Sequence, residues 1–307
     1  MKDAGLTFSI GLLLILSGIV LKSIAPSVFP LQFVYLGVAI GAFWFFSQID
    51  FDIISLFSKH LYIISIILLI ITLIIGQKEK VDFKRLFTAI LLLTLPVFLI
   101  LIQPSLGVSA LTVVGFCGVL ISSNFNKKYI LAGLATVLIL IPVFWQVMAP
   151  YQRQRISTFI NPSVDPLGAG YNSLQSTIAA GAGKITGRGL GRGVQTQLAF
   201  LPEKQTDFIF AAVSEEMGFV GAGIMLAATF VILFRLVAIV ENSISPAARA
   251  YVSGFFLIYL LQVFIHVGMN LGMLPVTGLP FPLVSAGGSS LLATMIGLGI
   301  ALGAYKR

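Results

Sequence analysis

The residues best suited to chemistry lie in one polar, glycine-rich interval, from Pro150 to Asp207, between long apolar runs. Loops between the helices of a membrane bundle are usually only a few residues long, so an interval of this length draws attention to function. Its many cations and few carboxylates could hold a phosphate group and move a proton. The basic residues are Arg153, Arg155, Lys184, Arg188, Arg192 and Lys204, and the acidic ones are Asp165, Glu203 and Asp207.

Within this interval, the segment Gly187-Arg-Gly-Leu-Gly-Arg-Gly193 alternates glycine with arginine. Glycine permits close approach to the backbone, so consecutive N–H groups can surround a phosphate while guanidinium groups hold it bidentately. The same pattern is also compatible with a flexible, solvated loop. It is not a Walker motif, because the required Gly-Lys-Ser/Thr ending is missing.

Carboxylates follow at the start of the next apolar run. Asp207 stands at its edge, where a carboxylate often serves as a helix N-cap or balances the helix dipole. Glu215 and Glu216 lie roughly 12 Å further along a helix, at about 1.5 Å per residue. Carboxylates inside a membrane are costly and indicate function by default. An ion pair with Arg235, or hydrogen bonds from neighbouring helices, would also account for them.

A second segment suited to anions runs from Gly278 to Ser290. Pro280 and Pro282 exclude a regular helix there, and the small residues that follow open the last apolar run. Helix N-termini and glycine-rich backbone favour anions, whereas close packing of helices by small residues is the alternative. The candidates for anion binding are Ser285, Gly287, Gly288 and Ser289.

Cysteine and histidine are too few in this sequence for a metal cluster. The single cysteine is Cys117 and the two histidines are His60 and His266. His266 and Asn270, one turn apart, are interpreted as buried hydrogen-bonded residues rather than metal ligands. The net charge of +8 resides mostly in loops that flank apolar runs. The membrane surface and an anionic lipid substrate are therefore the expected partners, and nucleic acid is not.

These residues must be positioned by membrane helices. The chain has 307 residues, of which 58% are hydrophobic and 10% charged, and its mean hydropathy is +1.03. Soluble domains carry about 25% charged residues. Runs of about 20 apolar residues span a bilayer, and backbone groups in lipid must be satisfied within their own segment, so these runs predict helices. They lie at 5–23, 28–47, 59–76, 86–103, 106–122, 128–148, 208–238, 250–272 and 284–304.

The predicted fold is all-α: a polytopic transmembrane bundle of about nine spans with a long extracytoplasmic loop. Residues 1–307 would form one integral membrane domain, with six spans in 1–148, the loop in 149–207 and three spans in 208–307. The basic loop 77–85, Lys127–Lys128 and Lys306–Arg307 are expected to face the cytoplasm. The long loop then lies outside, where its cations suggest a bound anion. An odd number of spans would place the N-terminus outside as well.

These patterns together resemble the FtsW/RodA/SpoVE family, the shape, elongation, division and sporulation proteins. The resemblance is dense from Pro150 onwards and weaker before it. The motifs that carry it are, in chain order, Arg155-Ile, Asp165-Pro-Leu-Gly-Ala-Gly-Tyr171, Gln175-Ser, Gly187-x-Gly-Leu-Gly, Leu201-Pro-Glu, Thr206-Asp-Phe-Ile-Phe-Ala, Glu215-Glu-x-Gly218, Leu279-Pro and Pro282-Leu-Val-Ser-x-Gly-Gly-Ser289.

The resemblance implies a glycosyltransferase that polymerises the lipid-linked peptidoglycan precursor, lipid II, at the outer face of the bacterial plasma membrane. A class B penicillin-binding protein, which is a transpeptidase, is the implied partner. Family members have also been described as lipid II flippases, so a protein that binds or moves lipid II is one alternative. A scaffold without catalytic activity, which recruits division or elongation enzymes, is another.

The resemblance also implies roles for single residues. The family's essential acid falls on Asp207, which would act as general base on a sugar hydroxyl or place a divalent cation, Mg²⁺ or Mn²⁺, on the pyrophosphate leaving group. No other cofactor is implied. Cations of the loop would neutralise the pyrophosphate. The substrate-binding candidates are Arg153, Arg155, Lys184, Arg188, Arg192, Glu203, Lys204, Glu215, Ser285, Gly287, Gly288 and Ser289.

The sequence departs from the family pattern in two places. Between Gly76 and Gln77, an outer segment and one further helix of the family's ten are missing, which accounts for the odd number of spans. Ser105 stands where the family has a carboxylate, in the motif Gln103-Pro-Ser-Leu-Gly107. Both departures predict a reduced site or a chain that has lost activity.

Overall fold

The computed structural model describes residues 3–49, 106–122, 148–162, 168–243 and 245–305, together with Val97, Ile100, Trp145, Gln146 and Asp165. The regular elements in these residues are helices, which agrees with the predicted all-α class. They are α1 (Ala4–Ile24), α2 (Phe29–Gln48), α6 (Leu106–Ser122), α8 (Pro150–Ile160), α9 (Ala169–Ala182), α10 (Val194–Gln197), α11 (Ile209–Asn242), α12 (Pro246–Asn270) and α13 (Gly288–Ala304).

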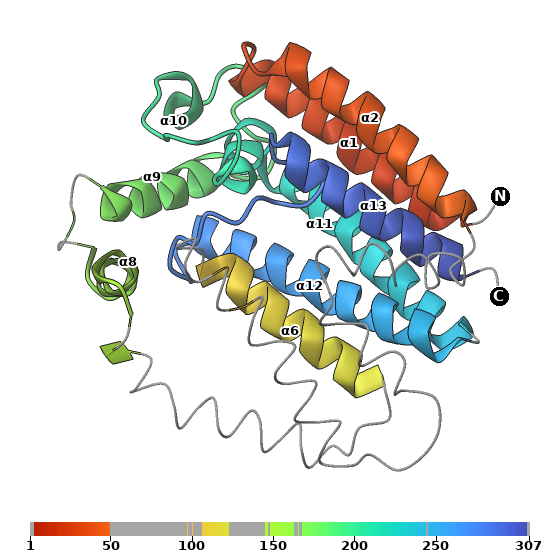
Figure 1. Ribbon diagram of the computed structural model, residues 1–307. Coiled ribbons are helices and arrows are strands. Elements are labelled where there is room, and N and C mark those ends of the chain that lie inside the picture. The colour runs from red at the N-terminus through yellow and green to blue at the C-terminus, as the bar shows by residue number, and fades with distance from the viewer. Residues whose placement is uncertain are drawn as a thin grey trace.

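In the part of the chain that the structure describes, the bundle consists of the apolar helices α1, α2, α6, α11, α12 and α13 (Figure 1). The most extensive pairings are α13 with α2, α12 with α6, α1 with α11 and α11 with α12. Helices α1, α2, α11 and α12 are long and apolar enough to cross a membrane, and α6 and α13 are shorter apolar helices. The chain is therefore a multi-pass membrane protein, and the apolar side chains on its surface face lipid.

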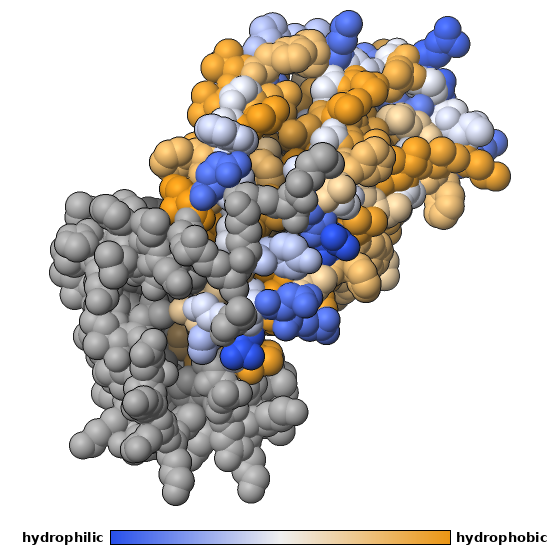
Figure 2. Space-filling model, turned by 90° about the vertical axis from the view of Figure 1, so that its right-hand side faces the viewer, coloured by the Kyte–Doolittle hydropathy of each residue, from blue (hydrophilic) through white to orange (hydrophobic). Residues whose placement is uncertain are grey.

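Seen from the end that carries the termini, apolar residues cover much of the described surface (Figure 2). Phe8 of α1 and Phe234 of α11 are 72% and 71% exposed. A soluble protein would not expose so much contiguous apolar surface, because large exposed patches of this kind are interaction sites or membrane surfaces. The surface thus supports the membrane location that the composition predicts.

Six of the predicted spans match observed helices within a few residues. The run 106–122 coincides with α6, and the run 5–23 differs from α1 by one residue at each end. The predicted run 250–272 is shifted, because Pro246 at the first turn and the cap hydroxyl of Ser245 start α12 earlier. The predicted span 59–76, most of 86–103 and of 128–148, the junction Gly76–Gln77 and Ser105 lie outside the described residues.

The N- and C-termini lie at the same end of the bundle (Figure 1). Asp3 caps α1 by accepting a hydrogen bond from the amide of Leu6, and it forms an ion pair of 2.8 Å with Arg235 near the far end of α11. Both termini thus lie at one end of the bundle, whereas an odd number of spans would have placed them on opposite sides. Arg235 is paired with this buried N-terminal carboxylate and not with Glu215 or Glu216.

The interval from Pro150 to Asp207 is structured, with helices α8, α9 and α10 at the end of the bundle opposite the termini (Figure 1). Helix α9 runs alongside the start of α11, and Gly183 just beyond α9 approaches Ser214 so closely that a Cβ would lie 1.7 Å from its carbonyl oxygen. The chain then turns back through residues 184–193 to α10. Gly183 therefore serves close packing of this interval against α11.

Helix α11 is broken at Gly218, where φ is 68° and ψ is −165°. The loop after α9 pairs with the backbone on both sides of the break. Phe219 N donates to Lys184 O (2.8 Å), and Glu215 O accepts from Arg188 N (2.9 Å). A Cβ at Gly218 would lie 2.3 Å from the amide nitrogen of Gly187. Only glycine fits both the conformation and the space.

We expect Gly218→Ala to destabilise the protein by at least about 2 kcal/mol, because it combines a disallowed backbone conformation with a clash against backbone atoms. The measurement is thermal unfolding of the detergent-purified protein. Gly223→Ala is the matched control in the same helix, since a Cβ there meets no atom within 4 Å. Equal unfolding temperatures for the two variants would contradict the assignment of the break to Gly218.

Candidate functional site

Asp207 lies in a tight turn directly before α11. The amides of Thr206, Asp207 and Phe208 all donate to the carbonyl of Glu203, at 3.1, 3.1 and 3.3 Å. The N-cap position belongs to Phe208, and no side chain caps this helix. The carboxylate of Asp207, which is half-buried, is therefore not used as an N-cap and remains available for chemistry.

Two buried side chains hold the backbone of this turn. Asn270, the last residue of α12, donates from Nδ2 to Asp207 O (3.0 Å) and accepts at Oδ1 from Ala211 N (3.0 Å). Ser285 donates from Oγ to Thr206 O (2.7 Å). Both side chains are almost completely buried, so these bonds are shielded from competing water. The position of Asp207 is thus fixed by α12 on one side and by the segment before α13 on the other.

The segment before α13 is itself held by α12. His266 bonds through Nδ1 to Leu279 O (2.7 Å), and Gln262 donates to Pro280 O (2.9 Å). Since a carbonyl only accepts, Nδ1 of His266 carries the proton. The interpretation of His266 and Asn270 as buried hydrogen-bonded residues is confirmed. Sequence reasoning missed Gln262, for which the only available signal was an isolated amide in an apolar run.

The surroundings of Asp207 raise the pKa of its carboxyl above the ordinary value of 3.8. Burial is the largest cause, because it penalises the charged form, and the neighbouring carboxylate of Glu203 adds to it. The charge of Arg155 and a hydrogen bond from Thr206 act in the opposite direction. The charges of Glu203 and Arg155 therefore act on Asp207, and these three residues are called the electrostatic unit of Asp207 below.

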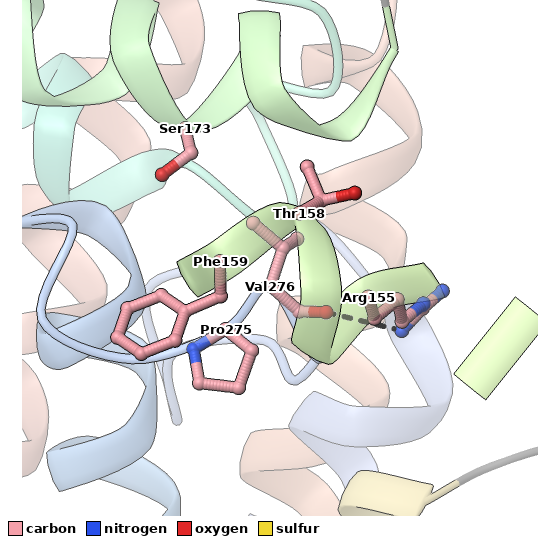
Figure 3. Close-up of a pocket in the computed structure, with 6 residues that line it drawn as sticks. All are labelled: Arg155, Thr158, Phe159, Ser173, Pro275 and Val276. Atoms are coloured by element: carbon pink, nitrogen blue, oxygen red, sulfur yellow. Dashed lines mark hydrogen bonds between the residues drawn. The ribbon is translucent and has the colours of Figure 1, made fainter. Parts of the chain in front are cut away.

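Arg155 projects from α8 toward the segment that follows α12. Its Nη1 donates to Val276 O (3.2 Å), and its side chain is exposed at the edge of a small pocket (Figure 3). A Cβ at nearby Gly278 would lie 3.6 Å from Oδ2 of Asp207. An exposed guanidinium beside an acid of raised pKa could hold an anion next to a proton acceptor. The pocket is lined by Arg155, Thr158, Phe159, Ser173, Pro275 and Val276.

Glu215 has a structural role in this structure. Its side chain is fully buried, and its two oxygens accept from Gln195 N and Thr196 N, each at 2.9 Å. These amides belong to the first turn of α10, whose N-cap is Gly193 and supplies no side chain. Glu215 caps α10 in its place. Both oxygens of Glu215 are thus occupied within the protein, and its predicted contact with substrate stays a prediction.

Glu216 and Lys204 belong to the same buried cluster. Glu216 accepts from Ser23 Oγ (2.5 Å) and Gln197 Nε2 (2.9 Å), while the ammonium of Lys204 donates to the carbonyl of Thr196. Burial lowers the pKa of Lys204, and the charges of Glu216 and Glu215 partly offset that effect. Lys204 thus links α10 to the turn that carries Asp207, and its ammonium is directed at the protein.

The cations of the loop separate into two groups. Arg155 lies near Asp207, whereas Lys184, Arg188 and Arg192 are exposed on the loop that pairs with the break in α11. That break is roughly 15 Å from Asp207 along the helix, at about 1.5 Å per residue. The amides of Arg188 and Gly189 bond to carbonyls of α11, so they do not form the predicted phosphate nest. Arg153 donates to Gln146 O.

The four small residues predicted to bind anions around the start of α13 have different surroundings. Ser285 is used by the turn of Asp207, and a Cβ at Gly288 would lie 2.7 Å from the ring of Tyr35 in α2. Gly287 is the N-cap of α13. Ser289 is exposed at a groove of about 550 Å³ between α2 and α13. Close helix packing, the alternative for this segment, thus accounts for Gly288.

In the described part of the chain, no three histidine, cysteine or acidic side chains come together in an arrangement that could hold a metal ion. The candidate oxygen ligands of the site are the carboxylates of Glu203 and Asp207. The hydroxyl of Thr206 lies beside them and donates to Glu203 Oε2 (3.1 Å). Mg²⁺ is often bound by one or two carboxylates together with water and substrate phosphate. These donors fit such a shared cation.

Comparison with known proteins gives a consistent result. The family model for FtsW/RodA/SpoVE, described as cell cycle protein, matches residues 79–306. The peptidoglycan glycosyltransferase MrdB of Escherichia coli is 37% identical over 271 residues, which are 86% of this chain and 73% of that protein. The stage V sporulation protein E of Bacillus subtilis is 31% identical, over 88% of this chain and 85% of that protein.

Solved structures agree with the fold. A chain in a structure on the coordination of polymerization and crosslinking by a peptidoglycan synthase complex has a TM-score of 0.78 and 27% identity, and the match covers 99% of this chain and 97% of that chain. The rod shape determining protein RodA of Thermus thermophilus has a TM-score of 0.66 at 24% identity, over 99% and 96% of the two chains. This second likeness concerns the fold alone.

Proposed function

This chain belongs to the FtsW/RodA/SpoVE family of cell cycle proteins, and from that premise we propose that it is a peptidoglycan glycosyltransferase. It polymerises lipid II at the outer face of the bacterial plasma membrane, during division or elongation of the cell. The family name covers both processes, and MrdB, the relative described above, is named for this reaction. Helices α8 to α10 and the turn of Asp207 lie at the outer end of the bundle.

The observation that carries this proposal is that the fold holds the backbone of Asp207 in place and leaves its carboxylate available. Its backbone is fixed by Asn270 and Ser285, while its carboxylate is not used by α11 and has a raised pKa. A general base works best when its pKa is shifted toward the working pH and its position is held by the fold. Asp207 therefore takes the proton from the acceptor sugar hydroxyl, as that oxygen attacks the anomeric carbon of the donor and the lipid pyrophosphate leaves.

The leaving pyrophosphate needs positive charge. Arg155 is the exposed cation in the electrostatic unit of Asp207, and Arg153 stands two residues before it on α8. A guanidinium holds phosphate oxygens bidentately, so Arg155 orients the donor and stabilises charge that develops on the pyrophosphate. A divalent cation bound by Asp207 and Glu203 would supply further neutralisation of that charge.

A transpeptidase of the class B penicillin-binding type is the proposed partner. The support is the solved peptidoglycan synthase complex, whose structure concerns the coordination of polymerization with crosslinking and includes a chain of this fold. A glycosyltransferase of this kind makes the glycan strand that the transpeptidase crosslinks. The pairing thus places two consecutive steps at one membrane position.

The test is direct. The purified protein, together with the transpeptidase of its own organism, is given labelled lipid II in detergent, and the products are separated by size. Glycan chains longer than the starting disaccharide are expected, and their absence at every cation and protein ratio would refute the proposal. A lipid II transporter is the weaker reading, because its sequence support came from Glu215 and Glu216, and both are occupied by hydrogen bonds within the protein.

Two variants are expected to shift the pH dependence of the reaction in opposite directions. A base must be ionised, so activity falls on acidification at a pH above the ordinary range of an aspartate. Arg155→Gln removes a charge that lowers the pKa of Asp207, so the acid limb should move to higher pH. Glu203→Gln removes a charge that raises this pKa, so the limb should move to lower pH.

The measurement is kcat/KM for chain formation against pH in both variants and in the unaltered protein. Loss of Arg155 also weakens donor binding, but that effect changes the height of the profile and not its midpoint. Midpoints that move in the same direction, or that do not move, would show that Asp207 is not the group whose ionisation limits the rate.

A further inference from the structure

We propose that Lys184, Arg188 and Arg192 bind the headgroups of anionic phospholipids in the membrane leaflet on the side of Asp207. These three residues, called the loop cations below, stand on the segment that joins α9 to α10. The sequence alone grouped them with the substrate site, but the structure places them on the loop that pairs with the break in α11 at Gly218.

The loop cations lie at the level where a membrane helix ends. The segment that carries them, together with α10 directly after it, lies against the last turn of α1. Gln197 donates to the carbonyl of Ser23 (3.3 Å), and a Cβ at Gly191 would lie 3.9 Å from Ser23 Oγ. Helix α1 ends one residue later, at Ile24. The ends of transmembrane helices lie near the headgroup region, so the loop cations stand at the height of lipid phosphates.

The same segment borders a surface that faces acyl chains. Lys184 and Ile185 accept backbone hydrogen bonds from Phe219 and Val220 of α11, at 2.8 and 3.1 Å. The side chains of Ile185, Phe219 and Val220 are 69%, 74% and 50% exposed. Apolar side chains exposed on a membrane-spanning helix contact lipid, and cations beside such a surface extend toward the headgroups.

The charge of this face is not compensated by the protein. No carboxylate in the described part of the chain lies within salt-bridge distance of the loop cations, although Arg188 Nε donates to Ala182 O (3.5 Å). Residues 183–202 contain no acid, and Lys22 on the last turn of α1 is a further exposed cation. The neighbouring carboxylates of Glu215 and Glu216 are buried and hydrogen-bonded. The face therefore complements an anion from outside the protein.

That anion is a phospholipid rather than the lipid-linked sugar. The site of Asp207 is roughly 15 Å further along α11, and the amides of Arg188 and Gly189 are already bonded to carbonyls of α11. The loop cations thus offer exposed side chains, while these two amides are not free to hold a phosphate. Such a surface attracts exchanging anionic lipid headgroups by charge. It is less suited to holding a single pyrophosphate group in one fixed orientation.

The test uses a local reporter. Phe219→Trp, made with Trp44→Phe and Trp145→Phe, puts the single tryptophan of the chain at the lipid-facing break. The protein is reconstituted in neutral vesicles that contain a small fraction of brominated phosphatidylglycerol or, in parallel, of brominated phosphatidylcholine. Stronger quenching by the anionic lipid is expected, and the difference should shrink as salt is raised.

Exchange of all three loop cations for glutamine should lower the preference for phosphatidylglycerol at least about tenfold, given the contribution of each cation near an anionic surface. Arg249→Gln removes an exposed cation at the opposite end of the bundle and should leave it unchanged. The conservative variants Arg188→Lys and Arg192→Lys keep the positive charge and should preserve the preference for phosphatidylglycerol. These variants keep the backbone bonds of the loop, so unfolding temperatures should agree.

Two results would overturn the proposal. One is equal quenching by the two brominated lipids in the unaltered reporter protein at low salt. The other is an unchanged preference in the triple glutamine variant, accompanied by a higher KM for lipid II, which would assign the loop cations to the substrate. Lipid quenching is measured without lipid II, so it does not depend on whether the protein polymerises it.

Discussion

Replacement of Asp207 by asparagine should lower the rate of glycan polymerisation by roughly 10²–10⁴, the contribution usual for a general base. Asparagine has the same shape but accepts no proton at neutral pH. The fold should not suffer, because Asn270 bonds to the backbone carbonyl of residue 207 and not to its side chain. The measurement is chain formation from labelled lipid II by the purified protein with its transpeptidase.

Two further variants make this result specific. Asp207→Glu restores a carboxylate but moves it by one methylene, about 1.5 Å, and a misplacement of this size can cost about 10² in rate, so rescue should be incomplete. Glu241→Gln neutralises an exposed carboxylate at the far end of α11 and should leave the rate unchanged. Full activity of Asp207→Asn, with unfolding temperature and lipid II binding equal to the unaltered protein, would remove Asp207 from the mechanism.

The membrane helices could be predicted from the sequence because their signal is local. Apolar runs define α6 and α1 to within a residue, since burial in lipid depends on the composition of a segment and little on its partners. Asp207 was likewise found from a motif that is continuous in the chain. The position of the two termini at one end of the bundle could not be predicted in this way. It follows from the ion pair of Asp3 and Arg235, which are far apart in the sequence.

The structure within the interval from Pro150 to Asp207 could not be predicted from the sequence. Its glycines look like loop residues, yet α10 forms there because a carboxylate from α11 caps it. The basic residues of this interval were predicted to form one binding group because they are close in sequence. In the structure the loop after α9 runs along α11, and this separates Arg188 from Arg155. Asn270 was recognised as buried, but its bond to the turn of Asp207 joins two distant segments. Tertiary contacts of this kind leave little trace in local composition.

The capping of α10 by Glu215 leads to the second large effect. Glu215→Gln should destabilise the protein by about 3 kcal/mol, since one of two buried amides then faces an N–H₂ group instead of an oxygen and loses its acceptor. The amides of Gln195 and Thr196 have no side chain of their own N-cap to replace it, because Gly193 holds that position. The loss should appear as a lower unfolding temperature in detergent.

The effect should also reach the catalytic turn. Lys204 is bonded to Thr196 O, so α10 supports the segment that leads to Glu203 and Asp207. Limited proteolysis within residues 184–200 should become faster in Glu215→Gln, and polymerisation should fall even at temperatures where the bundle stays folded. Glu241→Gln in the same helix is again the control, because its carboxylate is exposed. If Glu215→Gln unfolds at the temperature of this control, with the loop equally protected, then Glu215 does not hold α10. Its burial among hydrogen-bond donors would then have to be explained by contact with substrate, the role that the sequence first suggested.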